Sequence, residues 1–278
     1  MLVTLNDILP KARAEHYAVG LFNTTDSDML EAAIGAAEEL RSPIIIGTAE
    51  VLIPYGDLKL IAPGLIAAAK RASVPVVIHF DHGLTFERTL EALKLGFSSV
   101  MFDASAKEHD ANLAETAEIV RIAHAFGASV EGEIGHVGVA ANGDNDKTDM
   151  YTTPEEAVEF IDRTGVDALA VAIGSAHGVY KTKPQLNIGR LTEIAARVKE
   201  PLVLHGGSGL SDDDFRNTIR EGIAKVNIFT DICLAGQSAM QEGLGQGLNY
   251  IKTRNLKVER MKAAVMRKIE LFGSVGRA

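Results

Sequence analysis

The segment Pro75-Val76-Val77-Ile78-His79-Phe80 is followed directly by Asp81 and His82. Its apolar residues are nearly continuous, which is typical of a strand that is buried on both faces in a parallel sheet. The polar pair stands where such a strand would end. This stretch therefore predicts a buried strand that presents polar side chains at its carboxyl end.

The same pattern of a short apolar run followed by polar residues recurs along the chain. We expect eight strands, at residues 17–22, 43–47, 75–80, 98–103, 128–133, 167–173, 201–205 and 224–229. Helical segments lie between them. Examples are residues 110–126, which have an apolar face, a helix with a capping box and an early proline at Thr153, and a helix that begins at Ser211.

This alternation predicts the α/β fold class, as one closed (β/α)8 barrel, or TIM barrel, that forms a single domain over residues 1–278. An open, doubly wound parallel sheet is the alternative. It is disfavoured because no Gly-x-Gly-x-x-Gly follows the first strand, as a dinucleotide-binding sheet would require.

The composition narrows the class of partner. The formal net charge is −9 and there is no run of Lys or Arg, so we expect no nucleic acid partner and no binding to anionic membranes. There is no apolar stretch of about 18 residues, and residues 1–10 do not resemble a signal peptide. The single cysteine, Cys233, excludes an intrachain disulfide. A cytoplasmic location fits these features best.

The most reactive residue types fall at the predicted strand ends, which is where barrels of this kind hold their active sites. Three histidines, His82, His177 and His205, follow three different strands. Three imidazoles with one open position are typical of a catalytic zinc site. Asp103 and Glu133 could orient these rings or serve as alternative metal ligands. The competing interpretation is that each histidine is a hydrogen-bonded core residue.

The other five histidines are weaker candidates. We expect a structural hydrogen bond for His79, whose position in its strand points it into the barrel. His16, His109 and His124 fall in helical or loop contexts and should be solvated, whereas His136 is a weak candidate for the site lining.

A glycine-rich turn, Gly206-Gly207-Ser208-Gly209, precedes the helix start at Ser211. Glycines allow backbone N–H groups to approach an anion closely, and the serine adds a hydroxyl donor. Phosphate sites in barrels often form from the loops after the seventh and eighth strands. The turn therefore predicts a phosphate site, with a purely structural turn as the alternative.

Taken together, these motifs resemble those of a known family, the class II fructose- and tagatose-bisphosphate aldolases, and most closely its tagatose-type branch. The resemblance covers nearly the whole chain. The matching segments are Asp81-His82, Glu131-Gly132-Glu133-Ile134-Gly135, residues 170–178 (Ala-Val-Ala-Ile-Gly-Ser-Ala-His-Gly), residues 202–209 (Leu-Val-Leu-His-Gly-Gly-Ser-Gly), Lys225-Val226-Asn227-Ile228 and residues 271–277 (Leu-Phe-Gly-Ser-Val-Gly-Arg).

The resemblance implies a zinc-dependent lyase that cleaves a ketose phosphate or bisphosphate into dihydroxyacetone phosphate and an aldehyde. It implies zinc ligation by His82, His177 and His205, and an acid/base role for Asp81. The implied substrate contacts are Gly178, Gly206, Gly207, Ser208 and Thr230 for the phosphate, Asn227 for the dihydroxyacetone part, and less directly Asn23 and Thr48. The resemblance also implies a monovalent cation such as sodium beside the phosphate, and a homodimer or homotetramer.

Two departures concern the aldehyde half of the substrate. The acidic residues usual after the fifth strand are replaced by residues 138–142 (Gly-Val-Ala-Ala-Asn). Either Asp144, Asp146 or Asp149 substitutes for them, or the proton takes a different route. No basic residue for a second phosphate is evident; Lys181 and Arg277 are the candidates, with a solvated surface charge as the competing interpretation of each. The aldehyde product is therefore expected to differ from glyceraldehyde 3-phosphate. Another metal-dependent sugar-phosphate isomerase or epimerase, or a non-catalytic partner subunit on the same barrel, remain the alternatives.

Overall fold

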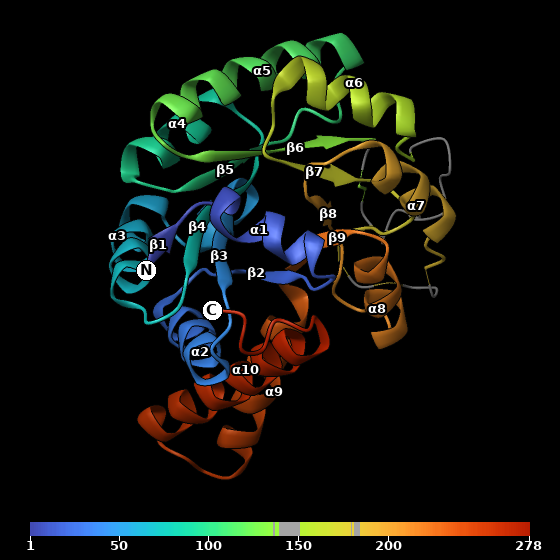
Figure 1. Ribbon diagram of the computed structural model, residues 1–278. Helices are drawn as coiled ribbons and strands as arrows, with labels where there is room; N and C mark the ends of the chain where they lie inside the picture. The colour runs from blue at the N-terminus through green and yellow to red at the C-terminus, as the bar shows by residue number, and fades with distance from the viewer. Residues whose placement is uncertain (136, 139–150, 179, 181–183) are drawn as a thin grey trace.

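The computed structural model describes residues 1–135, 137–138, 151–178, 180 and 184–278, and it shows a ring of parallel strands surrounded by helices (Figure 1). Among the described residues, eight strands form a barrel in chain order, and a short ninth strand, β1, extends the sheet beside β4. The strands are β1 (Leu2–Val3), β2 (Val19–Asn23), β3 (Ile44–Ala49), β4 (Val76–Gly83), β5 (Ser99–Phe102), β6 (Ser129–Ile134), β7 (Ala168–Val171), β8 (Leu202–Leu204) and β9 (Ile223–Ile228).

The pairing of the strands confirms the predicted closed parallel barrel. Each strand from β2 to β9 pairs with its neighbour in sequence, and β9 pairs with β2 through Leu21 opposite Asn227. The alternative of an open sheet is wrong, because the barrel strands leave no free edge. Each of the eight expected strands overlaps one barrel strand, with differences of one to three residues at the ends.

Helices follow the strands and cover the outside of the barrel (Figure 1). Their bounds are α1 (Leu5–Ala14), α2 (Ser27–Leu40), α3 (Leu58–Arg71), α4 (Phe86–Leu95), α5 (His109–Ala125), α6 (Pro154–Thr164), α7 (Ile188–Arg197), α8 (Asp212–Arg220), α9 (Thr230–Gly245) and α10 (Tyr250–Leu271), with a 3-10 helix η1 at Glu50–Tyr55. The last two helices pack against each other and α10 also packs against α2.

Two apolar layers hold the barrel together because successive residues of a strand point to opposite faces. In β3, Ile44 and Ile46 pack into the layer between the strands and the helices. Ile45 points inward and packs with Val77 and Met101. The strands are therefore buried on both faces, as their near-continuous apolar sequences predicted.

Helix α1 closes one end of the barrel. It crosses the middle of the ring in Figure 1, and its Leu5 and Leu9 pack into the inner apolar cluster with Val77. The strands enter the barrel at this end, so α1 seals the amino end and leaves the carboxyl end for polar groups.

The two helix starts predicted from local sequence are confirmed. Thr153 caps α6 in a capping box with Glu156, with proline at the first helical position. Ser211 caps α8 in the same way with Asp214. Such caps satisfy backbone N–H groups that the first turn leaves without partners.

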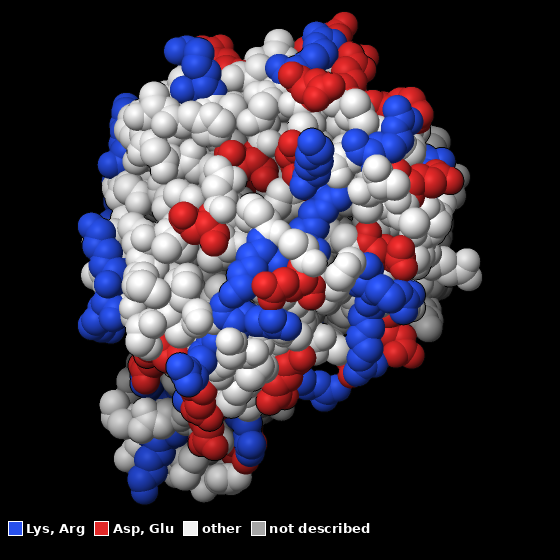
Figure 2. Space-filling view, in the orientation of Figure 1, with Lys and Arg blue, Asp and Glu red and all other residues white. Residues whose placement is uncertain are grey.

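Charged side chains of both signs are interspersed over the face shown in Figure 2. Among the described helices, none combines the length and the apolar composition needed to cross a lipid bilayer.

Candidate active site

A cavity of about 550 Å³ opens at the carboxyl ends of the barrel strands. Its lining includes residues that end or follow β2, β3, β4, β7, β8 and β9, together with Asp103, Val137 and Gly138. Eleven residues predicted for the site line this cavity: Asn23, Asp81, His82, Asp103, His177, Gly178, Gly206, Gly207, Ser208, Asn227 and Thr230. The carboxyl end of the barrel thus gathers residues that lie up to about two hundred positions apart in the chain.

His82 lies at a distortion of strand β4. The register between β4 and β5 shifts between Phe80 and Gly83, and His82 has φ of 42°, a left-handed conformation that is costly for residues with side chains. Its Nδ1 lies 2.8 Å from Oδ2 of Asp103. Asp103 therefore orients the ring so that Nε2 faces the barrel interior.

His205, directly after β8, is fully buried and is held from the opposite side. Its Nε2 lies 2.7 Å from Oε1 of Glu131, on strand β6. Its Nδ1 lies 2.8 Å from Nε2 of His82. Because each ring has a carboxylate at its other nitrogen, we assign those nitrogens as N–H donors, which leaves the two facing nitrogens to share a proton or a cation.

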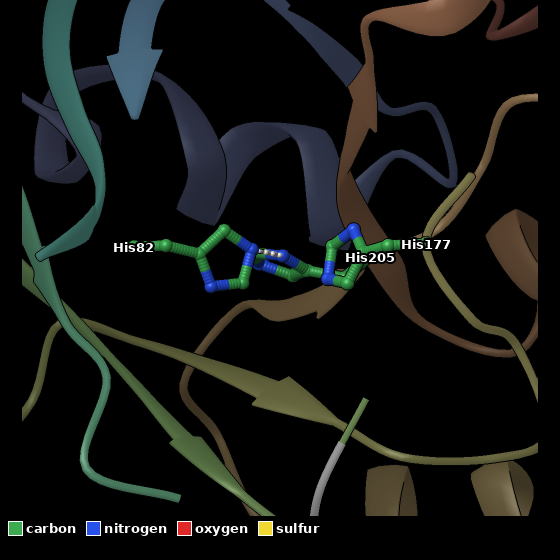
Figure 3. Close-up of side chains that lie close together, drawn as sticks. All are labelled: His82, His177 and His205. Atoms are coloured by element: carbon green, nitrogen blue, oxygen red, sulfur yellow. Dashed lines mark hydrogen bonds between the residues drawn. The ribbon is translucent and has the colours of Figure 1, made fainter. Parts of the chain in front are cut away.

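His177 completes the cluster from the loop after β7. Its backbone N–H donates to the carbonyl of Gly138 at 2.8 Å, which fixes the chain beside the cavity. Its ring centroid lies 4.8 Å from that of His82 and 5.7 Å from that of His205. Figure 3 shows the three rings turned toward one another. The buried Nε2 of His177 has no hydrogen-bond partner among the described residues.

This donor set fits a zinc ion. Two imidazole lone pairs that face each other at 2.8 Å repel unless a proton or a cation lies between them, and the buried Nε2 of His177 also lacks a partner. One nitrogen from each of His82, His177 and His205 lies within 4.8 Å of the others. Three imidazoles that leave an open position match catalytic zinc sites. His82 with Asp103 and Glu133 forms a second group that could hold a cation.

The histidines differ in basicity. Burial disfavours a charged ring, but the carboxylates of Asp81, Asp103 and Glu133 outweigh it and raise the pKa of His82 to about 10. Burial, and then the neighbouring His82, lowers the pKa of His177 to about 3. Burial also lowers the pKa of His205. A proton therefore competes with a metal ion mainly at His82.

Asp81 lies beside the histidine cluster and is held by two amides. Its Oδ2 accepts a hydrogen bond from Asn23 at 2.8 Å, and its Oδ1 accepts one from Asn227 at 2.9 Å. Burial opposes its ionisation, but the positive neighbours His82 and Lys225 lower the pKa of Asp81 well below its usual range. Asp81 is therefore an ionised carboxylate that can accept a proton within the cavity.

Glu133 differs from Asp103 in what it contacts. It accepts hydrogen bonds from Ser105 at 3.1 Å and from the backbone N–H of Val137 at 3.0 Å. Burial, and then the charge of Asp103, raises the pKa of Glu133 to about 8. Of the two carboxylates predicted to orient histidines, Asp103 contacts a ring directly, whereas Glu133 makes no hydrogen bond to one among the described residues.

The glycine-rich turn brings two loops unusually close together. Gly206 has φ of 67°, and a Cβ atom there would lie 2.4 Å from the carbonyl oxygen of Ala176. Ser208 follows, and its Oγ is 3.4 Å from the backbone N–H of Phe229, at the start of α9. The N-terminus of α9, including Thr230, thus faces the cavity beside this turn. Helix N-termini and glycine-rich turns favour anions.

The family described as fructose-bisphosphate aldolase class-II matches residues 3–277 of this chain. The chain belongs to the class II fructose-bisphosphate aldolase family. This confirms the predicted resemblance, and members of the family named below are aldolases, which are lyases.

Three relatives illustrate the similarity to class II aldolases. The fructose-bisphosphate aldolase of Thermus caldophilus is 41% identical over 306 residues, with 100% of both chains covered. The 6-phospho-5-dehydro-2-deoxy-D-gluconate aldolase of Shouchella clausii is 37% identical over 282 residues, which cover 99% of this chain and 96% of the relative. The crystal structure of the YdjI aldolase from Escherichia coli K12 superimposes with a TM-score of 0.92 at 38% identity, over 100% of both chains.

Several predicted aldolase positions fall elsewhere. Thr48 is fully buried, and its neighbour Ala49 lines the cavity instead. Arg277 donates to Glu15 and lies over the ring of Tyr17, next to the amino end of the barrel. Its candidacy for a second phosphate is therefore wrong, because the cavity is at the other end. Lys181, His136, Asp144, Asp146 and Asp149 lie outside the described residues.

The remaining histidines behave as the sequence suggested. The buried His79 hydrogen-bonds through Nδ1 to Oγ of Ser99 at 2.7 Å, and burial lowers its pKa to about 3. His16, His109 and His124 are exposed or nearly so; His109 and His124 pair with surface carboxylates.

Sequence reasoning gave no role to two residues that support the site. Glu131 holds the ring of His205, and Lys225 pairs with Glu131 at 2.7 Å inside the barrel. A signal was present: Glu131 shares strand parity with Glu133, and Lys225 with Asn227, so all four side chains point inward.

Proposed function

We propose that this chain is a zinc-dependent aldolase that reversibly cleaves a ketose phosphate into dihydroxyacetone phosphate and an aldehyde. The observation that supports this most strongly is the cluster of three histidines beside the ionised Asp81, in which His82, His177 and Asp81 line the cavity next to a glycine-rich turn and His205 is buried against them. The family membership supports the same reaction class.

Each residue has a distinct role in the proposed reaction. His82, His177 and His205 would hold zinc, which when bound supplies a Lewis acid for the substrate carbonyl. Asp81 accepts the proton of the C4 hydroxyl while the C3–C4 bond breaks and its electron pair moves toward the C2 carbonyl. The aldehyde then leaves, and the proton that Asp81 took up is returned to C3, directly or through solvent, which completes dihydroxyacetone phosphate and restores the Asp81 carboxylate. No Schiff-base lysine is required.

The phosphate of the dihydroxyacetone half would lie on the β7–β9 side. Gly178, Gly206, Gly207 and Ser208 line the cavity there, and Thr230 begins α9. Backbone N–H groups in such a turn bind an anion without a net positive charge, which suits a chain with a net charge of −9. A sodium ion beside the phosphate belongs to this proposal.

The aldehyde half would meet a different surface. Beyond Asp81 and His82, the described residues that β3, β4 and their loops contribute to the cavity are apolar: Ala49, Val51, Leu52 and Leu84. Among the described lining residues there is no Lys or Arg for a second phosphate. We therefore infer an aldehyde other than glyceraldehyde 3-phosphate, longer or unphosphorylated. The relative named for 6-phospho-5-dehydro-2-deoxy-D-gluconate supports variation of substrate among these aldolases.

The test is a retro-aldol assay on zinc-loaded protein. A panel of ketose 1-phosphates and 1,6-bisphosphates is offered, and release of dihydroxyacetone phosphate is followed by its reduction, with Asp81→Ala as control. Zinc-dependent release that requires Asp81 supports an aldolase, and the preferred substrate shows whether a second phosphate matters. Binding of zinc without release from any substrate would instead favour an isomerase or epimerase. Failure to bind zinc would favour a non-catalytic subunit.

The proposal extends to the setting in which the enzyme works. We expect a cytoplasmic homodimer or homotetramer whose partner is a small sugar phosphate. Light scattering after size-exclusion chromatography measures the assembly directly, and a monomeric mass would contradict it.

A further inference from the structure

Lys225 is the only lysine or arginine that is buried among the described residues, and its side chain is fully buried. It lies on β9 beneath the cavity. Its Nζ is 2.7 Å from Oε2 of Glu131 and donates to Oδ1 of Asn227, also at 2.7 Å. Burying an ammonium is costly unless it is paired and hydrogen-bonded. A buried lysine in this position therefore needs a reason beyond packing.

The contact with Asn227 fixes which way its amide faces. A lysine ammonium can only donate, so Asn227 must present its oxygen to Lys225 and its NH2 to Asp81. That NH2 donates to Oδ1 of Asp81 at 2.9 Å. Without the ammonium, the amide could rotate and bring its oxygen against the carboxylate of Asp81. Lys225 therefore ensures that Asn227 donates a hydrogen bond to Asp81, the acid/base residue.

The contact with Glu131 reaches the other half of the site. Glu131 uses Oε2 for Lys225 and Oε1 for Nε2 of His205, at 2.7 Å. The ion pair at one oxygen and the hydrogen bond at the other restrict rotation of this carboxylate, so the ring of His205 keeps its Nδ1 toward His82. The ammonium of Lys225 is thus linked to Asp81 through Asn227 and to His205 through Glu131.

We propose that Lys225 is a positioning residue that couples the acid/base carboxylate of Asp81 to the metal-facing ring of His205, through Asn227 on one side and Glu131 on the other. Lys225 does not itself line the cavity, but it contacts the lining residue Asn227, and it contributes no proton to the reaction. The inference rests on the proposed aldolase function for its kinetic consequence, but its effect on His205 holds for any metal bound there.

The test compares Lys225→Met with the double variant Glu131→Gln/Lys225→Met. Methionine keeps the length of the side chain, and the double variant leaves no unpaired buried charge, so it keeps the test valid where the single variant folds poorly. Lys257→Met is the matched control, since it removes a lysine paired with Asp28 between α10 and α2, away from the cavity. Each protein is measured for kcat and KM on the best substrate of the panel, and for zinc affinity by competition with a chelator.

We expect both Lys225 variants to lose about 100-fold in kcat while KM changes less than about threefold, because misplacement of a catalytic group by about 1 Å has this size of effect. We expect zinc affinity to fall about tenfold, as is typical when the partner of a metal-binding histidine is disturbed. Lys257→Met should change neither.

The proposal is overturned if the double variant keeps kcat and zinc affinity within about threefold of the wild type, because the ion pair would then serve packing alone. If the wild type releases no dihydroxyacetone phosphate from any substrate, the proposed function fails separately. Zinc affinity then decides the matter for Lys225: a fall confined to the Lys225 variants supports positioning of His205, and unchanged affinity overturns it.

Discussion

The two sides of the cavity are built from different chemistry. In the closed ring, β4 lies opposite β8 and β3 lies opposite β7. The β7–β9 side presents a glycine-rich turn and the start of a helix, whereas the loops after β3 and β4 present Val51, Leu52 and Leu84. The difference indicates that one side recognises an anion through the backbone, while the other contacts a substrate end without a matching charge.

The apolar side is nevertheless held firmly. Glu50 accepts hydrogen bonds from the backbone N–H groups of Leu84 at 2.8 Å and Thr85 at 3.0 Å, and from the Thr85 hydroxyl at 2.9 Å. These bonds tie the loop after β3 to the loop after β4. The apolar side is thus an organised surface, and substitution there should change selectivity more than stability.

Asp81 lies between the two sides, and its removal should have the largest effect. We expect Asp81→Asn, which keeps the shape and removes the charge, to lower kcat about 1000-fold, the range of general acid–base catalysis. Steady-state kinetics on the preferred ketose phosphate measures this. Zinc content and the thermal unfolding midpoint serve as controls. A loss of less than about tenfold would show that another group takes the proton.

The backbone on the anion side should respond next. A methyl group at Gly206 would meet the carbonyl oxygen of Ala176, in a conformation with φ of 67°. We expect Gly206→Ala to lower kcat/KM about 100-fold and to destabilise the fold by about 2 kcal/mol, because strain and overpacking act together. Kinetics and denaturant unfolding measure the two effects.

Gly178→Ala is the matched control for that change. Gly178 also has a positive φ, of 94°, but a Cβ atom there meets nothing among the described residues within 4 Å. We expect a conformational cost of about 1 kcal/mol and a smaller loss of kcat/KM than in Gly206→Ala, because Gly178 also lines the proposed phosphate site but has room for a methyl group. Equal effects of the two substitutions on kcat/KM would show that the close approach of the two loops does not matter.

The histidines also divide between the two sides. His177 and His205 come from the β7–β8 side and their pKa values are lowered, whereas His82 comes from β4 and has a pKa raised to about 10. Below that pKa a proton must leave His82 before zinc binds. Apparent zinc affinity should therefore fall about tenfold for each unit by which the pH is lowered. Chelator competition from pH 6 to 9 measures the slope.

A substitution of Asp103 tests whether the pH dependence of zinc affinity comes from His82. The carboxylate of Asp103 helps to raise the pKa of His82, so Asp103→Asn should lower that pKa and flatten the slope at the upper end of the range. A slope that stays the same in Asp103→Asn would mean that the competing proton is not on His82.

The sequence predicts site residues at the ends of strands better than site residues elsewhere in the chain. The strand ends could be predicted because apolar runs locate the strands, and carboxyl ends of parallel strands meet at one face. That reasoning brought Asp81 and His82 to the cavity and His205 to the histidine cluster next to it. Arg277 follows a helix and not a strand, so this reasoning could not place it, and it lies at the amino end of the barrel.

The supporting residues were harder to predict for a different reason. Parity shows that Glu131 and Lys225 point inward, but it does not show that they meet, since they lie on β6 and β9, two strands that are not neighbours. Contacts across a barrel interior depend on the register of several strands at once. Tertiary packing also fixes local register shifts, such as the one between β4 and β5 next to His82.

The smallest expected effect concerns the apolar side and sharpens the comparison most directly. Leu84 is 44% exposed at the cavity mouth. Leu84→Lys places a cation opposite the anion side, so kcat/KM for a 1,6-bisphosphate should rise about tenfold relative to the 1-phosphate, as expected from one charge-assisted contact. Stability should change by less than about 0.5 kcal/mol, because the site is at the surface. Leu84→Gln has similar length without charge and should leave the ratio unchanged. If both variants shift the ratio equally, shape governs selectivity at this side; if neither does, the second phosphate does not reach it.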